Sequence, residues 1–522
     1  MRVLYLDLDA LNPSHLSCYG YPRQTSPTID ALAARGLRGT NVYCSDAPCL
    51  PSRTAFYSGR FGMQTGVVGH GQTAADPKPQ GPSRGFKDRF TQDGLAGQLV
   101  NRGYHTAMIS PFGDRHSAHH FYAGFREMHN TGKNGNEIVD DVEPVLNRWI
   151  EDRAASDNWY LHLNYWDIHT AYRTPGEFGD PFKDAPLPEW FTDDLIQRQL
   201  QKTGPHSPLE IGGYMGTLDG FRYLNPENRR YPDTIESMDD LRTWINGYDA
   251  AIKYVDDAIA RLLGKLDEAG VLDDTLILVS ADHGENQGDM AIYGEHGTAD
   301  HATCHLPFIL AGPGVVQGHV DHELHYHLDF APTLIDLIDG DDGKCPEVWD
   351  GRSWADTVRT GTPVGRDDLV VSQCCHVCQR GVRFTTDPDH AWMYVRSYHD
   401  GFHNFPQEML FNLVDDPHEQ TDVAGQHPEI CAAAAWRLSR WHDANMQKMA
   451  RFCGDVVDPL WTVVREGGPL HASVSPPGNP GTQGLRDYLD RLEATGRAEG
   501  AATIRANHAQ RYADFNRGAA PL

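Results

Sequence analysis

Continuous hydrophobic runs recur along this chain, and polar residues follow several of them. The clearest runs span residues 3–8, 106–110, 159–165 and 275–280. The first is followed by Asp9 and the last by Asp282 and His283. Runs of this length are typical of strands buried on both faces, and stretches with helical spacing lie between them. We therefore predict an α/β fold with a large mixed, mainly parallel sheet sandwiched by helices.

Two segments carry the signs of helices. Residues 26–36 begin with Ser-Pro and end in glycine, which are typical start and stop signals. From residue 237 to 270, apolar residues recur at spacings of three and four, as in a helix with one buried face. Residues 176–236 break this rhythm, being rich in proline, glycine and aromatic residues. Because long segments of this kind are often functional, we expect an insertion near the functional site.

The C-terminal part has a different pattern. Short apolar runs at residues 369–371, 382–384 and 392–395 alternate with turn residues, which predicts a small antiparallel sheet, joined by a helix. We expect residues 455–485 to be irregular and residues 486–513 to form a polar, alanine-rich helix. We therefore expect three parts in the chain: an α/β domain over 1–365, a small α+β subdomain over 366–454, and an extended tail with a terminal helix over 455–522.

Composition narrows the function. The chain has 522 residues, with 45 basic against 72 acidic side chains and a net charge of −27, which argues against a nucleic-acid or anionic-membrane partner. Met1 leads directly into the first strand, with no apolar leader or membrane span. Ten cysteines without a secretion signal are expected to be reduced thiols, so we predict a cytoplasmic protein.

The stretch Cys49-Leu50-Pro51-Ser52-Arg53 carries the strongest chemical signal. Pro51 fits the first turn of a helix, which places Cys49 at the N-terminus of that helix. The helix dipole and the free amide groups there favour a developing anion. A cysteine before a turn proline can also be a buried structural residue, but that role does not require this placement.

The motif C-x-P-S-R, followed by Ser58-Gly59-Arg60, resembles the signature of type I, formylglycine-dependent sulfatases in the alkaline-phosphatase superfamily. The resemblance implies an alkaline-phosphatase-like fold and oxidation of Cys49 to formylglycine by a formylglycine-generating maturation enzyme. It also implies that the hydrated aldehyde supplies the nucleophile, and that Arg53 braces its oxygen.

The resemblance further implies one divalent metal ion. Its ligands would be Asp9, Cys49 as formylglycine, Asp282 and His283, all at the carboxyl edge of the sheet. Asp7 lies on the same strand face as Asp9 and is either a fifth ligand or a hydrogen-bond acceptor behind the ligands. We expect Ca²⁺; Mn²⁺ and Zn²⁺ are alternatives, because His283 stands where many sulfatases have asparagine.

Histidines supply the remaining candidate catalytic residues. His169 matches the family histidine that contacts the transferred group and the leaving oxygen, and an acid role there suits imidazole. His296 stands where the family usually has lysine, either as a cation or as a neutral hydrogen-bonding group. His70 follows the motif helix where relatives place a polar active-site residue. A second family lysine is missing after residue 109; its candidate replacements are Arg115, His116 and His119.

A cysteine cluster, Cys374-Cys375-His376-Val377-Cys378, is compatible with zinc, but no second ligand pair follows at the usual spacing. We favour His376 lining the outer substrate pocket.

The function predicted from these residues is hydrolysis of a sulfate monoester. The substrate would be a small aryl or sugar sulfate. The alternative is a phosphonate monoester hydrolase or phosphodiesterase on the same scaffold, which Asp282-His283 and the missing lysines favour. A catalytically inactive binding protein would need a damaged nucleophile or metal set, and neither is evident. The tail either joins a neighbouring subunit in a homo-oligomer or packs on its own chain.

Overall fold

The computed structural model describes residues 1–78, 89–203, 210, 229–232, 234–340, 343–401, 403–465 and 488–507. Parts of the expected insertion and of the expected tail therefore lie outside the described residues.

The larger sheet has eight strands in the order β5-β4-β6-β1-β7-β8-β2-β9. Their bounds are β1 (Arg2–Leu8), β2 (Leu37–Tyr43), β4 (His105–Ile109), β5 (Glu127–His129), β6 (Trp159–Tyr165), β7 (Thr275–Ser280), β8 (His305–Ala311) and β9 (His319–Tyr326). All neighbouring pairs are parallel except those of β8, which is antiparallel to β7 and to β2. The predicted mixed, mainly parallel sheet is confirmed.

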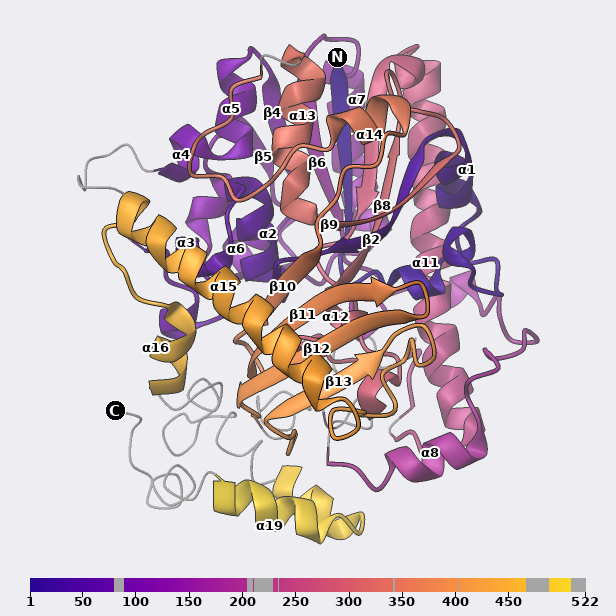
Figure 1. Ribbon diagram of the computed structural model, residues 1–522. Coiled ribbons are helices and arrows are strands. Elements are labelled where there is room, and N and C mark those ends of the chain that lie inside the picture. The colour runs from indigo at the N-terminus through magenta and orange to yellow at the C-terminus, as the bar shows by residue number, and fades with distance from the viewer. Residues whose placement is uncertain are drawn as a thin grey trace.

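Helices cover both faces of this sheet (Figure 1). Leu4 and Leu6 of β1 pack in one hydrophobic cluster with residues of α1 (Pro27–Arg35), α7 (Val139–Arg153) and α11 (Met238–Glu268). Val3 and Tyr5 point to the other face, where they join residues of α2 (Cys49–Ser58), α5 (Leu95–Asn101), α13 (Phe330–Asp339) and α14 (Ala355–Thr360). The continuous apolar run of β1 is thus explained by burial on both sides.

The smaller sheet has five strands in the order β13-β12-β11-β10-β3. They are β3 (Asp46–Ala47), β10 (Asp368–Gln373), β11 (Cys378–Asp387), β12 (His390–His399) and β13 (Glu408–Asn412). The pairs among β10 to β13 are antiparallel, as predicted, and α15 (Pro428–Phe452) crosses this sheet (Figure 1). The edge strand β3 belongs to the N-terminal part and pairs with β10 in parallel. The smaller sheet is therefore anchored directly before Cys49, while the domain boundary at 365 stays a prediction.

Two tail expectations are corrected. The segment expected to be irregular contains α16 (Pro459–Arg465), because Asp458 accepts a hydrogen bond from the Leu460 N–H (3.1 Å) at the start of that helix. The single helix expected over 486–513 is divided: residues 488–494 are helical, and α19 (Ala498–Asn507) follows Gly496. Gly496 has φ +81°, a left-handed conformation that interrupts a helix and favours glycine.

The described part of the tail packs on its own chain. The Tyr488 hydroxyl donates to the carbonyl of Thr203 (2.9 Å), and Arg497 pairs with the buried Glu210 at 2.6 Å. Both partners lie in the segment expected to be an insertion. These contacts tie the tail to that segment.

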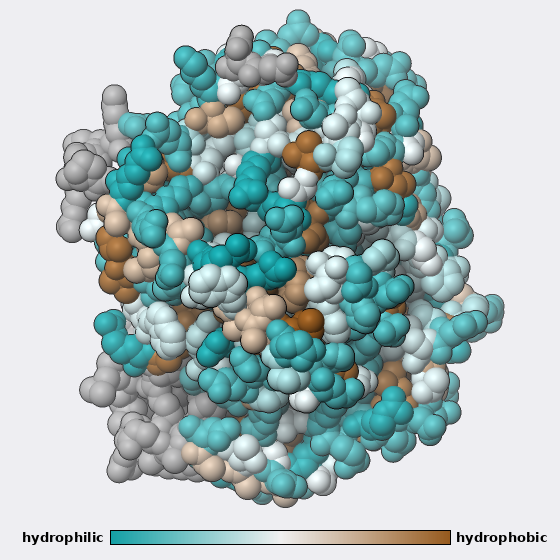
Figure 2. All heavy atoms as spheres, viewed as in Figure 1, coloured by the Kyte–Doolittle hydropathy of each residue, from teal (hydrophilic) through white to brown (hydrophobic). Residues whose placement is uncertain are grey.

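The remaining helices are short: α3 (Gly62–Thr65), α4 (Arg89–Asp93), α6 (Phe112–Arg115), α8 (Asp193–Gln199) and α12 (His301–Cys304), with 3₁₀ turns that include η1 (Pro13–His15). The face seen in Figure 2 is mostly hydrophilic, and its hydrophobic residues are scattered. Within the described ranges, every helix is too short or too polar to cross a membrane.

Candidate active site

The candidate site lies where β1 and β7, neighbouring parallel strands, reach their carboxyl ends. Asp9 follows β1, Asp282 and His283 follow β7, and Cys49 is the first residue of α2. One ligand atom from each of these four residues lies within 4.8 Å of the others. The sequence therefore identified a set that the fold brings together from three distant segments.

The donor set fits a divalent cation. All four residues are buried, with exposures of 0–2%. Asp9 Oδ1 and the nearby Asp7 Oδ1 are buried without a hydrogen-bond partner among the described residues. Carboxylate oxygens and one imidazole are ligands that Ca²⁺, Mn²⁺ or Zn²⁺ accept to different degrees. Buried carboxylates with unused oxygens need a compensating charge, and a metal ion would supply it.

Arg53 ties the carboxylates together. Its Nε donates to Asp7 (2.7 Å), its Nη1 to Asp282 (2.5 Å) and its Nη2 to Asp9 (2.9 Å). Burial alone would raise the pKa of Asp7 and of Asp9, but the Arg53 charge lowers both below their usual values. Each nitrogen of Arg53 thus donates to a carboxylate, which makes Arg53 a structural brace for the candidate metal site.

Asp7 has a second partner that sequence reasoning missed. His162, buried on β6, lies with Nε2 2.9 Å from Asp7 Oδ2. A histidine within the apolar run Trp159–Tyr165 was the available signal, because a polar side chain buried in a strand needs a partner. Asp7 lies outside the four-residue group, yet its Oδ1 is unpaired, so both interpretations of Asp7 stay open.

Cys49 contacts the metal-site histidine directly. Its Sγ lies 3.0 Å from Nε2 of His283, whose Nδ1 donates to the Gly284 carbonyl (2.8 Å). Burial, and then the charges of Asp9 and Asp282, raise the pKa of the Cys49 thiol well above its usual value. An unmodified Cys49 is therefore a neutral thiol in this environment.

His169 and His296 lie beside this group. The His296 ring stacks on His283 at 4.5 Å and meets His169 edge-on at 4.9 Å. Burial lowers the pKa of both His169 and His296. Nδ1 of His296 lies 3.7 Å from a carboxylate oxygen of Glu285, a buried residue that sequence reasoning did not single out. The pKa direction favours the neutral form of His296 over the cationic alternative.

His70 also reaches the site. Its Nε2 accepts the N–H of Leu50 (3.3 Å), next to Cys49, and its ring lies 4.8 Å from that of His116. Of the three candidate replacements for the missing lysine, His119 is exposed, whereas His116 and Arg115 are partly buried. His116 thus lies beside His70, whereas Arg115 lies over the Trp166 ring.

His376 belongs to a buried charged cluster. Glu295 accepts hydrogen bonds from His376 Nδ1 (2.6 Å) and from His403 Nε2 (2.9 Å). Burial alone would lower the pKa of His376, but Cys375 and Glu295 raise it to about 10. No cysteine of the 374–378 segment belongs to a metal-ligating group among the described residues.

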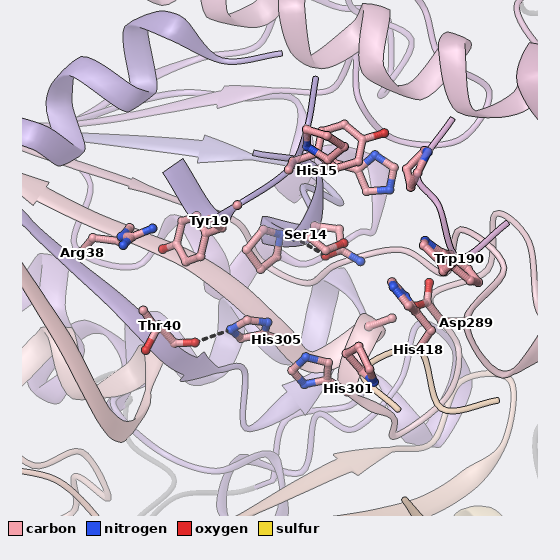
Figure 3. Close-up of a pocket in the computed structure, with 18 residues that line it drawn as sticks. Ser14, His15, Tyr19, Arg38, Thr40, Trp190, Asp289, His301, His305 and His418 are labelled. Atoms are coloured by element: carbon pink, nitrogen blue, oxygen red, sulfur yellow. Dashed lines mark hydrogen bonds and ion pairs between the residues drawn. The ribbon is translucent and has the colours of Figure 1, made fainter. Parts of the chain in front are cut away.

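A cavity of about 570 Å³ lies beside η1 and the start of β8 (Figure 3). His301, His305 and Arg38 line it, and His305 Nε2 donates to the carbonyl of Thr40 (2.8 Å). None of its described lining residues is Asp9, Cys49, Asp282 or His283.

Comparisons with known proteins identify the family and the fold. An arylsulfatase from Hemicentrotus pulcherrimus is 26% identical over 377 residues, which cover 69% of this chain and 62% of that protein. The chain thus spans less than two thirds of that relative's length. A solved 2-O GAG sulfatase matches with a TM-score of 0.64 at 19% identity, covering 86% of this chain and 93% of that one. A phosphonate monoester hydrolase from Silicibacter pomeroyi matches with a TM-score of 0.61 at 21% identity, covering 86% and 95%.

At these identities the two solved structures show a shared fold. The family model described as Sulfatase matches residues 2–340, which include Cys49, Arg53 and every candidate metal ligand. The chain therefore belongs to the sulfatase family.

Proposed function

We propose that this protein hydrolyses a sulfate monoester by means of a formylglycine formed from Cys49 and one divalent metal ion. The observation that carries the proposal is the convergence of Cys49 with Asp9, Asp282 and His283 within 4.8 Å. The intact C-x-P-S-R motif supports modification of Cys49, and family membership supports a sulfated substrate.

The metal would be held by Asp9, Asp282, His283 and the oxygen that modification places at position 49. When bound, it supplies Lewis acidity toward the oxygens of the ester, and the modified residue supplies the nucleophile. Ca²⁺ is our first expectation, with Mn²⁺ and Zn²⁺ as alternatives because of His283.

The chain's own residues orient the reaction and move protons. Arg53 fixes the carboxylates through its three hydrogen bonds. Since a carbonyl can only accept, His169 Nδ1 donates to Thr170 O (2.7 Å), which leaves Nε2 as the atom that would face the leaving oxygen. Nε2 must take up a proton before it can give one to that oxygen. The imidazole side chains of His296 and His70 would also line the site and hydrogen-bond the transferred group.

A phosphonate monoester hydrolase or phosphodiesterase is the second candidate, favoured by Asp282-His283 and by the absence of lysine at both family positions. The two functions are distinguished by kcat/KM for p-nitrophenyl sulfate, p-nitrophenyl phenylphosphonate and p-nitrophenyl phosphate, measured on protein with verified modification and metal. We expect the sulfate to lead. A clear lead for the phosphonate would establish the second candidate, and turnover of the phosphate equal to that of the sulfate would refute the sulfatase assignment.

The cytoplasmic location, the maturation enzyme and a homo-oligomer formed through the tail remain predictions from the sequence.

A further inference from the structure

One arginine near the site has no carboxylate partner in the part of the chain that the structure describes. Arg115, the last residue of α6, donates Nη1 to the carbonyl of Gly135 (3.2 Å) and lies with its guanidinium 4.5 Å from the Trp166 ring centre. Gly135 permits this approach, since a Cβ there would lie 1.9 Å from Arg115 Nη1. The guanidinium is therefore held in place by a backbone contact and an aromatic face, and no described carboxylate forms an ion pair with it.

A series of ring contacts places Arg115 at the edge of the candidate active site. The Trp166 ring lies 5.7 Å from the ring of His169, which in turn lies 4.9 Å from His296. Arg115 thus approaches the reacting centre from the side of His169, the residue that we assign to the leaving oxygen.

Arg115 and Arg53 differ in how far they are buried. Arg53 is 2% exposed, and each of its three nitrogens already donates one hydrogen bond to a carboxylate of the candidate metal site. Arg115 is only partly buried. Because part of Arg115 is exposed, an anion can reach it from the solvent.

Two polar atoms around Arg115 lack partners among the described residues. Nε1 of Trp166, whose side chain is 1% exposed, and the buried Nε2 of His116 have no hydrogen-bond partner there. Buried polar atoms of this kind are normally satisfied, and a ligand oxygen is one way to satisfy the Trp166 N–H. A planar guanidinium fork suits a carboxylate or sulfate better than an ammonium does.

We propose that Arg115 binds a second anionic group, a carboxylate or sulfate carried by the alcohol half of the substrate. The proposal rests on the sulfatase function proposed above and specifies its substrate class: sulfate esters of acidic alcohols. Trp166 acts as a positioning residue, because its ring fixes the plane of the guanidinium. With a net charge of −27, the protein as a whole repels such a doubly charged substrate, so a local unneutralised cation is needed to hold it.

Binding of non-hydrolysable sulfonates tests this without turnover. Calorimetry on metal-loaded protein would compare benzenesulfonate with 3- and 4-sulfobenzoate, in which a carboxylate is added to the same ring. We expect a sulfobenzoate to bind the wild type about 10- to 100-fold more tightly than benzenesulfonate, the size of one charge-assisted contact. Arg115→Met should remove this preference, Arg115→Lys should retain part of it, and Arg126→Met, a change at an exposed arginine, should retain all of it.

Kinetics with choline sulfate and p-nitrophenyl sulfate separate the outcomes. Choline carries a positive charge, so Arg115→Met should raise the ratio of kcat/KM for choline sulfate to that for p-nitrophenyl sulfate. An equal loss for all ligands would show that Arg115 binds the transferred group, and unchanged ratios would show that it binds neither; both overturn the proposal while sulfatase activity remains. A wild type that cleaves no sulfate ester and binds no sulfonate would instead refute the proposed function, and this inference with it.

Discussion

Nε2 of His283 lies 3.0 Å from Sγ of Cys49, although 234 residues separate them in the chain. The contact joins the start of α2 to the end of β7, so the motif cysteine and the candidate metal site form one unit. A change at either residue is therefore expected to affect both metal binding and the nucleophile.

Modification of Cys49 is the first prediction. Protein produced together with a maturation enzyme should show an aldehyde at residue 49 in the tryptic-peptide mass, and activity should rise with the modified fraction. Cys49→Ala should abolish activity, whereas Cys345→Ser, at a half-buried cysteine far from the motif in sequence, should not. Full activity from protein in which residue 49 is entirely cysteine would refute the prediction.

The second prediction concerns removal of a proposed metal ligand. Asp282→Ala should lose both the bound ion and activity, because an oxygen-rich site rarely survives the loss of a charged ligand. Elemental analysis and the melting temperature with and without chelator would be measured. At a metal concentration 100-fold above its Kd, the ion should contribute about 2.7 kcal/mol to the free energy of unfolding.

Asp274→Ala, at an exposed carboxylate that pairs with Arg2, is the matched control and should keep the ion. Full metal occupancy in the Asp282→Ala variant would contradict the assignment of the ligand.

Arg53→Met is predicted to be a stability variant as well as a catalytic one. The change leaves three buried carboxylates, Asp7, Asp9 and Asp282, without their shared partner. Breaking a buried ion pair by removing one partner typically costs about 3–5 kcal/mol. Chemical denaturation should show a loss of this order without metal and a smaller loss with saturating metal, since the ion compensates part of the charge.

An equal stability loss with and without metal would show that Arg53 and the ion do not share these carboxylates. Arg148→Met, at an exposed arginine of α7, serves as the control.

The Glu295–His376 pair predicts a pH dependence of stability. The pKa of His376 is raised to about 10, and that of Glu295 is held well below its usual value once the two histidine charges outweigh burial. A raised histidine pKa adds stability that is fully present below the unfolded value, about 6.5, and is lost as pH rises through the folded value. The free energy of unfolding should therefore fall between about pH 6.5 and pH 10.

Glu295→Gln tests this by urea denaturation at pH 6, 8 and 10. The variant should lose about 3–5 kcal/mol at pH 6 and show a flatter profile, because the buried imidazolium has lost its carboxylate. Asp387→Asn removes the carboxylate of an exposed His390 pair and should leave the profile unchanged. An unaltered slope in Glu295→Gln would locate the pH dependence elsewhere.

The fold was largely predictable because its strands are apolar on both faces. The run from Val3 to Leu8 indicated a central strand without knowledge of its neighbours, and both Leu4 and Tyr5 are fully or nearly fully buried. The helices of the tail could not be predicted in the same way. The break at Gly496 depends on a local backbone conformation that a polar, alanine-rich pattern does not reveal.

The site was predictable where a motif or a strand end marked it, as at Cys49 and Asp282. His162 and Glu295 were missed because their partners are distant in sequence: His162 meets Asp7 across 155 residues, and Glu295 meets His403 across 108. Arg115 could be named as a candidate, but its direction depends on Gly135 and Trp166, which no local pattern connects to it.

The last prediction concerns the charge of the transferred group. Sulfate and phosphonate monoesters carry one negative charge at neutral pH, and a phosphate monoester carries nearly two. The family resemblance predicts a lysine at the position of His296. Burial, followed by the His283 charge, lowers the pKa of His296, so this position supplies no fixed cation. A site with fewer cations offsets less of the desolvation cost of a dianion than of a monoanion. His296→Lys should therefore improve kcat/KM for p-nitrophenyl phosphate relative to the sulfate.

One added unit charge at about 4 Å is worth about 1–4 kcal/mol per unit of substrate charge, so a ratio change of tenfold or more is expected. His296→Gln, which adds no charge, should lower both values and leave their ratio close to that of the wild type. A phosphate-to-sulfate ratio that does not rise in the lysine variant, with metal content and modification verified, would show that charge at this position does not set the preference.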